Sequence, residues 1–215
     1  MQSALGVDPH GEAEIDTLAP YWRLALEHAW GPHYLEVGHY GMWAATNPAR
    51  VTSNGTDKTL DVAFDAEYQY FGEGHDVTVL STFIHENDDW NASHPLGFTD
   101  RSSTVLNAFN LTGTYLYDKT YGVDLGIFDI NGRPDKSLYP DSGTGSPDSI
   151  GEIVELEYLP FNKNGGPGFW PYSNVKLMAQ YVIYQQFDGS RSNVDGAGRK
   201  ASDNNTFYLQ AWIVF

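Results

Sequence analysis

The stretch NTFYLQAWIVF, residues 205–215, decides the expected fold of this chain. Side chains alternate across a β-strand, so one face of this stretch would be wholly apolar, with Phe207, Leu209, Ala211, Ile213 and Phe215. Soluble proteins rarely end on such an uncapped, aromatic and unbroken strand. A bacterial outer-membrane β-barrel does, because its last strand is paired on both sides.

Composition narrows the class of protein. The chain has 215 residues, a formal net charge of −16 and no cysteine. The acidic charge argues against nucleic acid as a partner, and the absence of cysteine excludes a disulfide framework, a thiolate metal site and a haem-attachment motif. Aromatics make up 14% of the residues although the mean hydropathy is −0.41. This combination suits a barrel with aromatic girdles and a wet interior, and it also suits a secreted β-sandwich.

Alternating patterns predict about nine antiparallel strands of nearly the ~9–11 residues that cross a membrane at a tilt. The expected strands are 21–30, 33–44, 60–71, 75–86, 105–117, 121–130, 150–159, 174–187 and 205–215. Short turns at 31–32, 72–74 and 118–119, and a longer one at 160–173, alternate with long polar loops at 46–59, 87–104, 131–149 and 188–204. Barrels of the outer membrane show this alternation, because their periplasmic turns are short and their surface loops long. The pattern therefore favours an up-and-down transmembrane β-barrel over a sandwich.

The number of strands suggests a larger parent. A complete bacterial barrel has an even number of strands with both termini in the periplasm, whereas the first of the nine expected strands would start outside the cell. We therefore expect residues 1–18 to form an extracellular loop or disordered lead-in, and residues 19–215 to form part of a larger barrel. The acidic, polar start, residues 1–19, contains no signal peptide, which suggests a mature form or a fragment.

Several segments resemble the outer-membrane porin–cytochrome fusion family, of the iron-oxidising monohaem type. They are PHYLEVGHYGM (32–42), STFIHENDDWNAS (81–93), YGVDLGIF (121–128), GSPDS (145–149) and DGAGRKASDNNTFYLQAWIVF (195–215). The resemblance implies the C-terminal part of a porin of about sixteen strands, with haem c on an N-terminal domain. It also implies a periplasmic cytochrome as another possible partner. The Cys-x-x-Cys-His motif is absent, so the resemblance assigns no haem ligand, and no cofactor, to this chain.

Charged residues gather on the strand faces opposite the apolar ones. If the apolar faces touch lipid, the lumen is lined by Glu27, Glu36, Asp61, Asp65, Glu67, Glu86, Asp124, Glu155 and Glu157. The matching basic residues are Arg23 and Lys176. Such a lining favours cations or grips a basic plug domain; alternatively, it is an ordinary solvated lumen.

Two smaller groups of residues carry further expectations. A carboxylate–imidazole cluster is a weak candidate for a divalent-cation site, and a solvated loop entrance is the favoured explanation: His85, Glu86, Asp88 and Asp89. A second group would anchor the barrel at the membrane interfaces: Trp22, Trp30, Tyr68, Tyr70, Tyr115, Tyr117, Tyr121 and Tyr158. The apolar residues of the terminal strand resemble the signal read by the barrel-assembly machinery.

Three functions follow from these patterns. The first is the porin part of a cytochrome-porin, a scaffold for extracellular electron transfer in a Gram-negative outer membrane, with lipid and lipopolysaccharide around it. The second is a cation-preferring porin without a redox role. The third is a secreted β-sandwich that binds carbohydrate through its aromatics. No nucleophile–base arrangement, phosphate loop or pair of catalytic carboxylates stands out, so we do not expect an enzyme.

Overall fold

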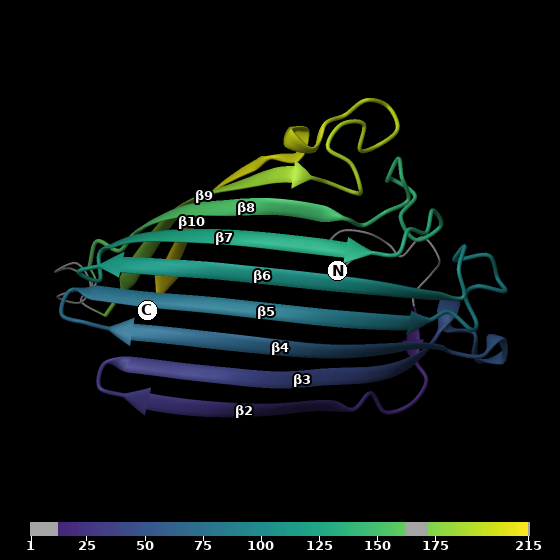
Figure 1. Cartoon of the computed structure of the whole chain (residues 1–215), viewed down its shortest axis with the longest axis horizontal. Coiled ribbons are helices and arrows are strands. Elements are labelled where there is room, and N and C mark those ends of the chain that lie inside the picture. Colours follow the sequence, from purple (N-terminus) through teal and green to yellow (C-terminus); the bar gives the residue numbers. More distant parts are fainter. Residues whose placement is uncertain (1–12, 162–171, 215) are drawn as a thin grey trace.

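The computed structural model describes residues 13–161 and 172–214, and these form one antiparallel sheet of ten strands (Figure 1). The strands are β1 (Glu14–Ile15), β2 (Tyr21–Trp30), β3 (His33–Asn47), β4 (Asp57–Phe71), β5 (His75–Asp89), β6 (Ser103–Tyr117), β7 (Tyr121–Gly132), β8 (Ser149–Tyr158), β9 (Asn174–Gln186) and β10 (Thr206–Val214). Short 3-10 helices lie in the loops, at Pro48–Arg50, Thr52–Asn54 and Ala201–Asn204. Within the described ranges, no helix is long and apolar enough to span a membrane.

The chain runs up and down, so that each strand from β3 to β10 pairs with the next in sequence. The two-residue β1 pairs with one end of β3, at Thr46 and Asn47, and β2 pairs with the rest of that edge. The sheet is open, with β2 at one edge and β10 at the other. The described residues form no second sheet over either face, as the sandwich alternative would require.

The all-β, antiparallel expectation is confirmed, and strand ends at the short turns agree closely with it. Trp30 pairs with His33 across a two-residue turn, as the Gly31-Pro32 signal predicts. At the β6–β7 turn, Asp118 and Lys119 have φ values of 52° and 51°, the left-handed pair of a type I′ turn. At the other end several strands are longer than predicted, and β1 lies within the predicted lead-in.

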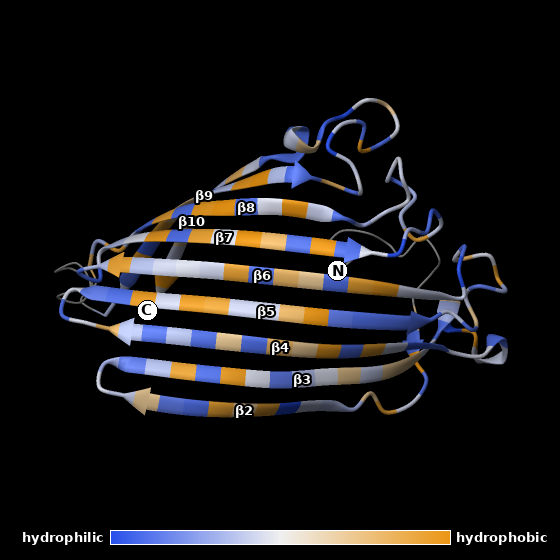
Figure 2. Ribbon diagram, viewed as in Figure 1, coloured by the Kyte–Doolittle hydropathy of each residue, from blue (hydrophilic) through white to orange (hydrophobic). Residues whose placement is uncertain are grey.

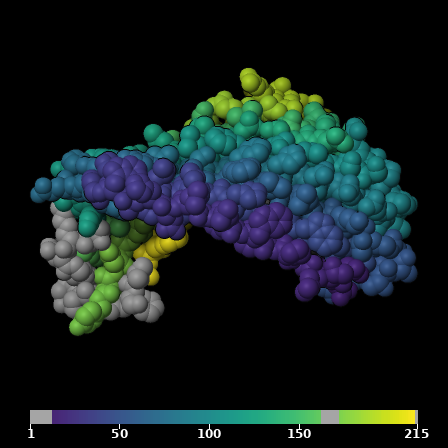
Figure 3. Space-filling view, turned by 60° about the horizontal axis from the view of Figure 1, so that its bottom comes forward, coloured from purple at the N-terminus to yellow at the C-terminus, as the bar shows by residue number. Residues whose placement is uncertain are grey.

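The sheet is curved, and its two faces differ in chemistry. Figure 2 shows apolar and polar residues alternating along most strands, and Figure 3 shows the sheet arching over a hollow. Side chains splay apart on the outer side of a curved sheet and crowd on the inner side. Leu24, Phe64 and Leu125 are 68%, 56% and 58% exposed, whereas Glu155 and Glu157, on the opposite face, are 7% and 8% exposed. The apolar face is therefore convex and the acidic face concave.

The long loops are tied together at the end of the sheet away from the turns. Asp135 is 2% exposed, and its carboxylate accepts hydrogen bonds from the backbone N–H groups of Asp100 and Arg101 in the neighbouring long loop. In the next pair of loops, the N–H of Gly143 donates to the carbonyl of Val194 at 2.7 Å. Three long loops thus form one hydrogen-bonded layer.

Candidate functional site

The apolar face is bounded at both ends. On β6, its side chains run from Tyr117 to Phe109, and the next residue on this face is Asn107. At ~3.3 Å per residue, this stretch is about 30 Å long, which at the tilt of membrane barrels is close to their apolar band of ~25 Å. Beyond it, a polar row crosses three strands: His85 Nδ1 lies 2.7 Å from Asn107 Oδ1, and Asn107 Nδ2 donates to Asn131 Oδ1 at 3.1 Å.

Aromatic rings line the turn end of the apolar face. Trp30 stacks on His33, and Tyr121 stacks on Tyr158, with 5.2 and 5.4 Å between ring centroids. Two hairpins repeat one arrangement, in which a histidine at the start of a strand contacts a tyrosine hydroxyl of the next strand. These pairs are His33 with Tyr68, at 2.8 Å, and His75 with Tyr115, at 2.7 Å.

This row contains most of the predicted interface aromatics. Trp22 lies apart from it, nearer the loop end, where its indole Nε1 donates to His39 Nε2 at 3.2 Å.

The pairing register brings all the predicted lumen acids onto one face. Cross-strand pairs connect Glu27 with Glu36, Glu36 with Glu67, Asp61 with Glu86, and Asp124 with Glu155. Like charges directly opposite each other in a sheet are destabilising. The repeated juxtaposition therefore lowers the stability of the sheet and raises the negative potential along the concave face.

One end of the acidic face is organised by Arg23. Its guanidinium forms ion pairs with Glu36 at 2.6 Å and with Asp65 at 2.5 Å. The absence of a side chain at Gly38 leaves room for this ion pair, because a Cβ there would collide with the Asp65 carboxylate and would lie 3.2 Å from Arg23 Nη2. Tyr40 packs against the guanidinium, with 5.6 Å between its ring centroid and Cζ. Glu27 and Glu67 are left without an ion pair in the described sheet.

A second group lies on β7, β8 and β9. The carboxylate oxygens of Asp124, Glu155 and Glu157 lie within 4.8 Å of one another. Lys176 forms an ion pair with Glu157, and Gln180 donates to Glu155 at 2.7 Å. Oδ1 of Asp124 is buried and accepts no hydrogen bond in the described structure. Among the described residues, the one ion pair of this group joins Lys176 to Glu157.

The predicted cation cluster at the end of β5 is divided between the two faces. Alternation places His85 and Asp89 on the exposed, apolar side, while Glu86 and Asp88 point to the concave side. His85 is hydrogen-bonded to Asn107, and Asp88 Oδ1 accepts a hydrogen bond from Thr59 Oγ1 at 2.7 Å. The structure thus brings Glu86 and Asp88 together but not the four residues.

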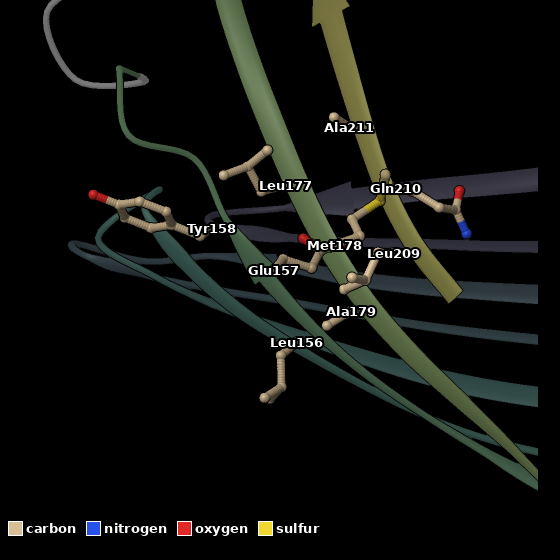
Figure 4. A pocket seen from close by; sticks show the side chains of 9 residues that line it. All are labelled: Leu156, Glu157, Tyr158, Leu177, Met178, Ala179, Leu209, Gln210 and Ala211. Carbon is tan, nitrogen blue, oxygen red and sulfur yellow. The ribbon is translucent and has the colours of Figure 1, made fainter. Parts of the chain in front are cut away.

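The terminal strand places Phe207, Leu209, Ala211 and Ile213 on the apolar face, as predicted, and Phe215 lies outside the described residues. A shallow groove of 510 Å³ lies where β8, β9 and β10 twist away from the rest of the sheet (Figure 4). Its apolar lining includes Leu156, Leu177 and Leu209.

The sequence predicts that Asp124, Glu155 and Glu157 lie on one face, but it does not predict that their carboxylates converge. Glu155 and Glu157 are two residues apart in one strand and so share a face. Their proximity to Asp124 depends on the β7–β8 register, and a long loop joins these strands, so no tight turn fixes that register.

Comparisons of the chain with protein-family models, with curated proteins and with solved structures find no match.

Proposed function

We propose that this sheet forms part of the wall of a bacterial outer-membrane β-barrel, with its apolar face against lipid and its acidic face along a lumen that favours cations. The reversed pattern of burial carries the proposal: large apolar side chains are exposed on the convex face, while carboxylates are buried on the concave face. In water, an apolar surface of this extent is unfavourable. In a bilayer the same arrangement is the expected one.

The two ends of the sheet support an orientation. The aromatic row at the turn end matches an interfacial girdle, and the hydrogen-bonded long loops lie at the other end. We place the turns in the periplasm and the loops outside the cell, in contact with lipopolysaccharide. The apolar residues of β10 would be recognised by the barrel-assembly machinery during insertion.

The acidic face supports the cation preference. A surface with many carboxylates and two basic residues, Arg23 and Lys176, concentrates cations near it. The scaffold role in electron transfer rests on the sequence resemblance alone. In that role, the same face would hold a basic haem-bearing segment supplied by the rest of the parent protein or by a periplasmic cytochrome.

A pair of arginine substitutions tests the membrane proposal. Leu125 is 58% exposed on the convex face, in the middle of the apolar stretch of β7, and Thr112 lies on the concave face of β6. In lipid, Leu125→Arg should lower the free energy of unfolding by about 2–4 kcal/mol, whereas Thr112→Arg should have a much smaller effect. In water, an exposed leucine tolerates arginine within about 0.5 kcal/mol. Denaturant unfolding in phosphatidylcholine vesicles, with flotation to verify insertion, separates the cases. Equal, small effects for both variants would contradict the proposal.

A further inference from the structure

A pocket of 300 Å³ lies on the concave face, and its lining comes from five neighbouring strands, β2 to β6. Two adjacent rows across β4, β5 and β6 contribute most of its side chains: Asp65, Thr82 and Asn110 in one row, and Glu67, Leu80 and Thr112 in the next. At the ~30 Å³ that a water molecule occupies in the liquid, this space corresponds to about ten waters. The pocket is therefore much larger than a bare metal ion requires.

One carboxylate of the pocket has no cationic partner among the described residues. Arg23 forms ion pairs with Glu36 and Asp65. Glu67 lies directly opposite Glu36 and accepts a hydrogen bond from the side-chain amide of Gln69. Three carboxylates thus face one guanidinium, so the pocket attracts positive charge. A divalent metal ion takes several oxygen ligands at once, whereas Glu67 offers the single carboxylate outside the ion pairs, which suits one ammonium group.

The rest of the lining offers hydrogen bonds and one apolar surface. Thr112 Oγ1 donates to Asn110 Oδ1 at 3.2 Å. The amide nitrogen of Asn110 and the hydroxyl of Thr82 have no partner in the described part of the chain. Leu80 is 43% exposed on this otherwise polar side of the sheet. Free polar groups around an exposed apolar side chain match a ligand with an apolar face and hydroxyl groups at its edge, as in a sugar ring.

Resting on the proposed function for its place in a lumen, we propose that this pocket binds an amino sugar, a sugar-sized solute that carries one ammonium group. The ammonium group binds Glu67. The ring hydroxyls bind Thr82, Asn110 and Thr112, and the CH face of the ring packs on Leu80. The general cation preference of the concave face thus narrows, at this pocket, to one class of solute.

Three probes test this assignment with the unaltered chain. D-glucosamine carries the ammonium group and the hydroxyls, D-glucose lacks the ammonium group, and methylammonium lacks the ring. The full chain, refolded into phosphatidylcholine vesicles, is brought to dialysis equilibrium with each radiolabelled probe at about pH 6, where an amine is protonated. Protein-free vesicles give the background. We expect glucosamine to bind on the order of tenfold more tightly than either of the other probes.

Two substitutions separate the two parts of the proposed contact. Glu67→Gln keeps the size of the side chain and removes its charge, so it should weaken glucosamine binding by on the order of tenfold and leave glucose binding unchanged. Thr112→Val keeps the shape and removes the hydroxyl, so it should weaken the binding of both sugars and leave that of methylammonium unchanged. Glu73→Gln, at an exposed turn, makes the same charge change outside the pocket and should alter none of the three affinities.

Several results would overturn the inference. Equal affinities for glucosamine and methylammonium, or equal losses in Glu67→Gln and Glu73→Gln, would show that the potential of the whole chain holds the cation. Equal affinities for glucosamine and glucose would exclude the ammonium contact. The comparison of probes uses the unaltered chain, so it decides the matter even if a variant does not fold.

Flotation of the same vesicles tests the membrane location separately. A chain that binds glucosamine selectively but does not float with the vesicles would support the pocket and contradict the proposed function. A chain that floats without preferring glucosamine would contradict the pocket alone.

Discussion

Arg23 lies directly over Gly38, and its Nη2 atom would be 3.2 Å from a Cβ placed on that glycine. The guanidinium of Arg23 forms ion pairs with Glu36 and Asp65 on two neighbouring strands at once. The missing side chain at Gly38 therefore leaves the space that the Asp65 carboxylate and the guanidinium occupy.

Gly38→Ala should disrupt this arrangement. The added methyl group would collide with the Asp65 carboxylate, and overpacking of this kind typically lowers the free energy of unfolding by about 1–3 kcal/mol. Gly113→Ala is the matched control, because nothing lies within 4 Å of a Cβ at that strand glycine. Denaturant unfolding in vesicles measures both. Equal stability of the two variants would show that Arg23 does not depend on Gly38.

Removing one charge from the Glu27–Glu36–Glu67 row should stabilise the sheet and weaken the negative potential. Glu67→Gln relieves repulsion from Glu36 directly opposite, worth about 0.2–1 kcal/mol and less at high salt. Glu73→Gln makes the same charge change at an exposed turn and serves as the control. Denaturant unfolding at low and at high salt measures the gain in stability.

The potential itself is measurable in a reconstituted channel. In lipid bilayers that contain the reconstituted chain, the reversal potential under a KCl gradient should shift toward zero for Glu67→Gln and remain unchanged for Glu73→Gln. A larger shift for Glu73→Gln would show that the concave face does not govern ion preference.

Asp135 should control the order of the long loops without controlling the sheet. Its buried carboxylate accepts from four backbone N–H groups, those of Asp100, Arg101, Ser137 and Leu138. Asp135→Ala leaves these donors without their acceptor, at about 1–3 kcal/mol for each that stays buried. Hydrogen exchange should accelerate in the two loops while the strand amides stay protected. Asp141→Asn, at an exposed position of the same loop, should change little. Accelerated exchange throughout the sheet would contradict this local role.

The contact between the same loops should weaken in acid. Hydrogen bonds from Ser137 Oγ and the Lys136 N–H hold the pKa of Asp100 below its ordinary value of 3.8. Because the pKa of Asp100 is lower in the folded loops, its carboxylate stabilises the folded loops when the pH is above the ordinary pKa of 3.8. This stabilisation is lost as the pH falls through the lowered pKa of the folded state. Proteolysis of residues 90–102 by an acid-active protease should therefore increase below about pH 3.8. Asp100→Asn should remove that pH dependence; an unchanged profile in this variant would exclude Asp100 as its source.

Some features follow from the sequence and others do not. Period-two alternation is local, so it could be predicted without knowledge of the strand pairing that Phe64 and Asp65 point to opposite faces of the sheet. Two-residue turns fix the register of a hairpin, so the cross-strand pairing of Glu27 with Glu36 could also be predicted. A long loop does not fix the register of the strands that it joins, so the pairing of Asp124 with Glu155 could not be predicted. The bonds from Asp135 to the neighbouring loop join segments far apart in sequence and leave no periodic signal.

The division of His85 from Glu86 has an equally simple reason. Adjacent residues of a strand point to opposite faces, so a run of neighbouring ligands in a strand cannot converge on one ion. The openness of the sheet also lies beyond alternation, because the pattern within each strand does not specify whether the two edges of the sheet meet.

The direction of the apolar face is tested most directly by nitroxide spin labels at single cysteines, which the cysteine-free chain permits. The labels are placed at Leu125 and Leu209 on the convex face and at Thr82 and Thr112 on the concave face. In phosphatidylcholine vesicles, we predict that labels at Leu125 and Leu209 collide mainly with oxygen, which concentrates in lipid. Labels at Thr82 and Thr112 should collide mainly with a water-soluble nickel chelate. Labels at Leu125 and Leu209 that are accessible to the chelate, in a chain that stays folded and monomeric without lipid, would contradict the account.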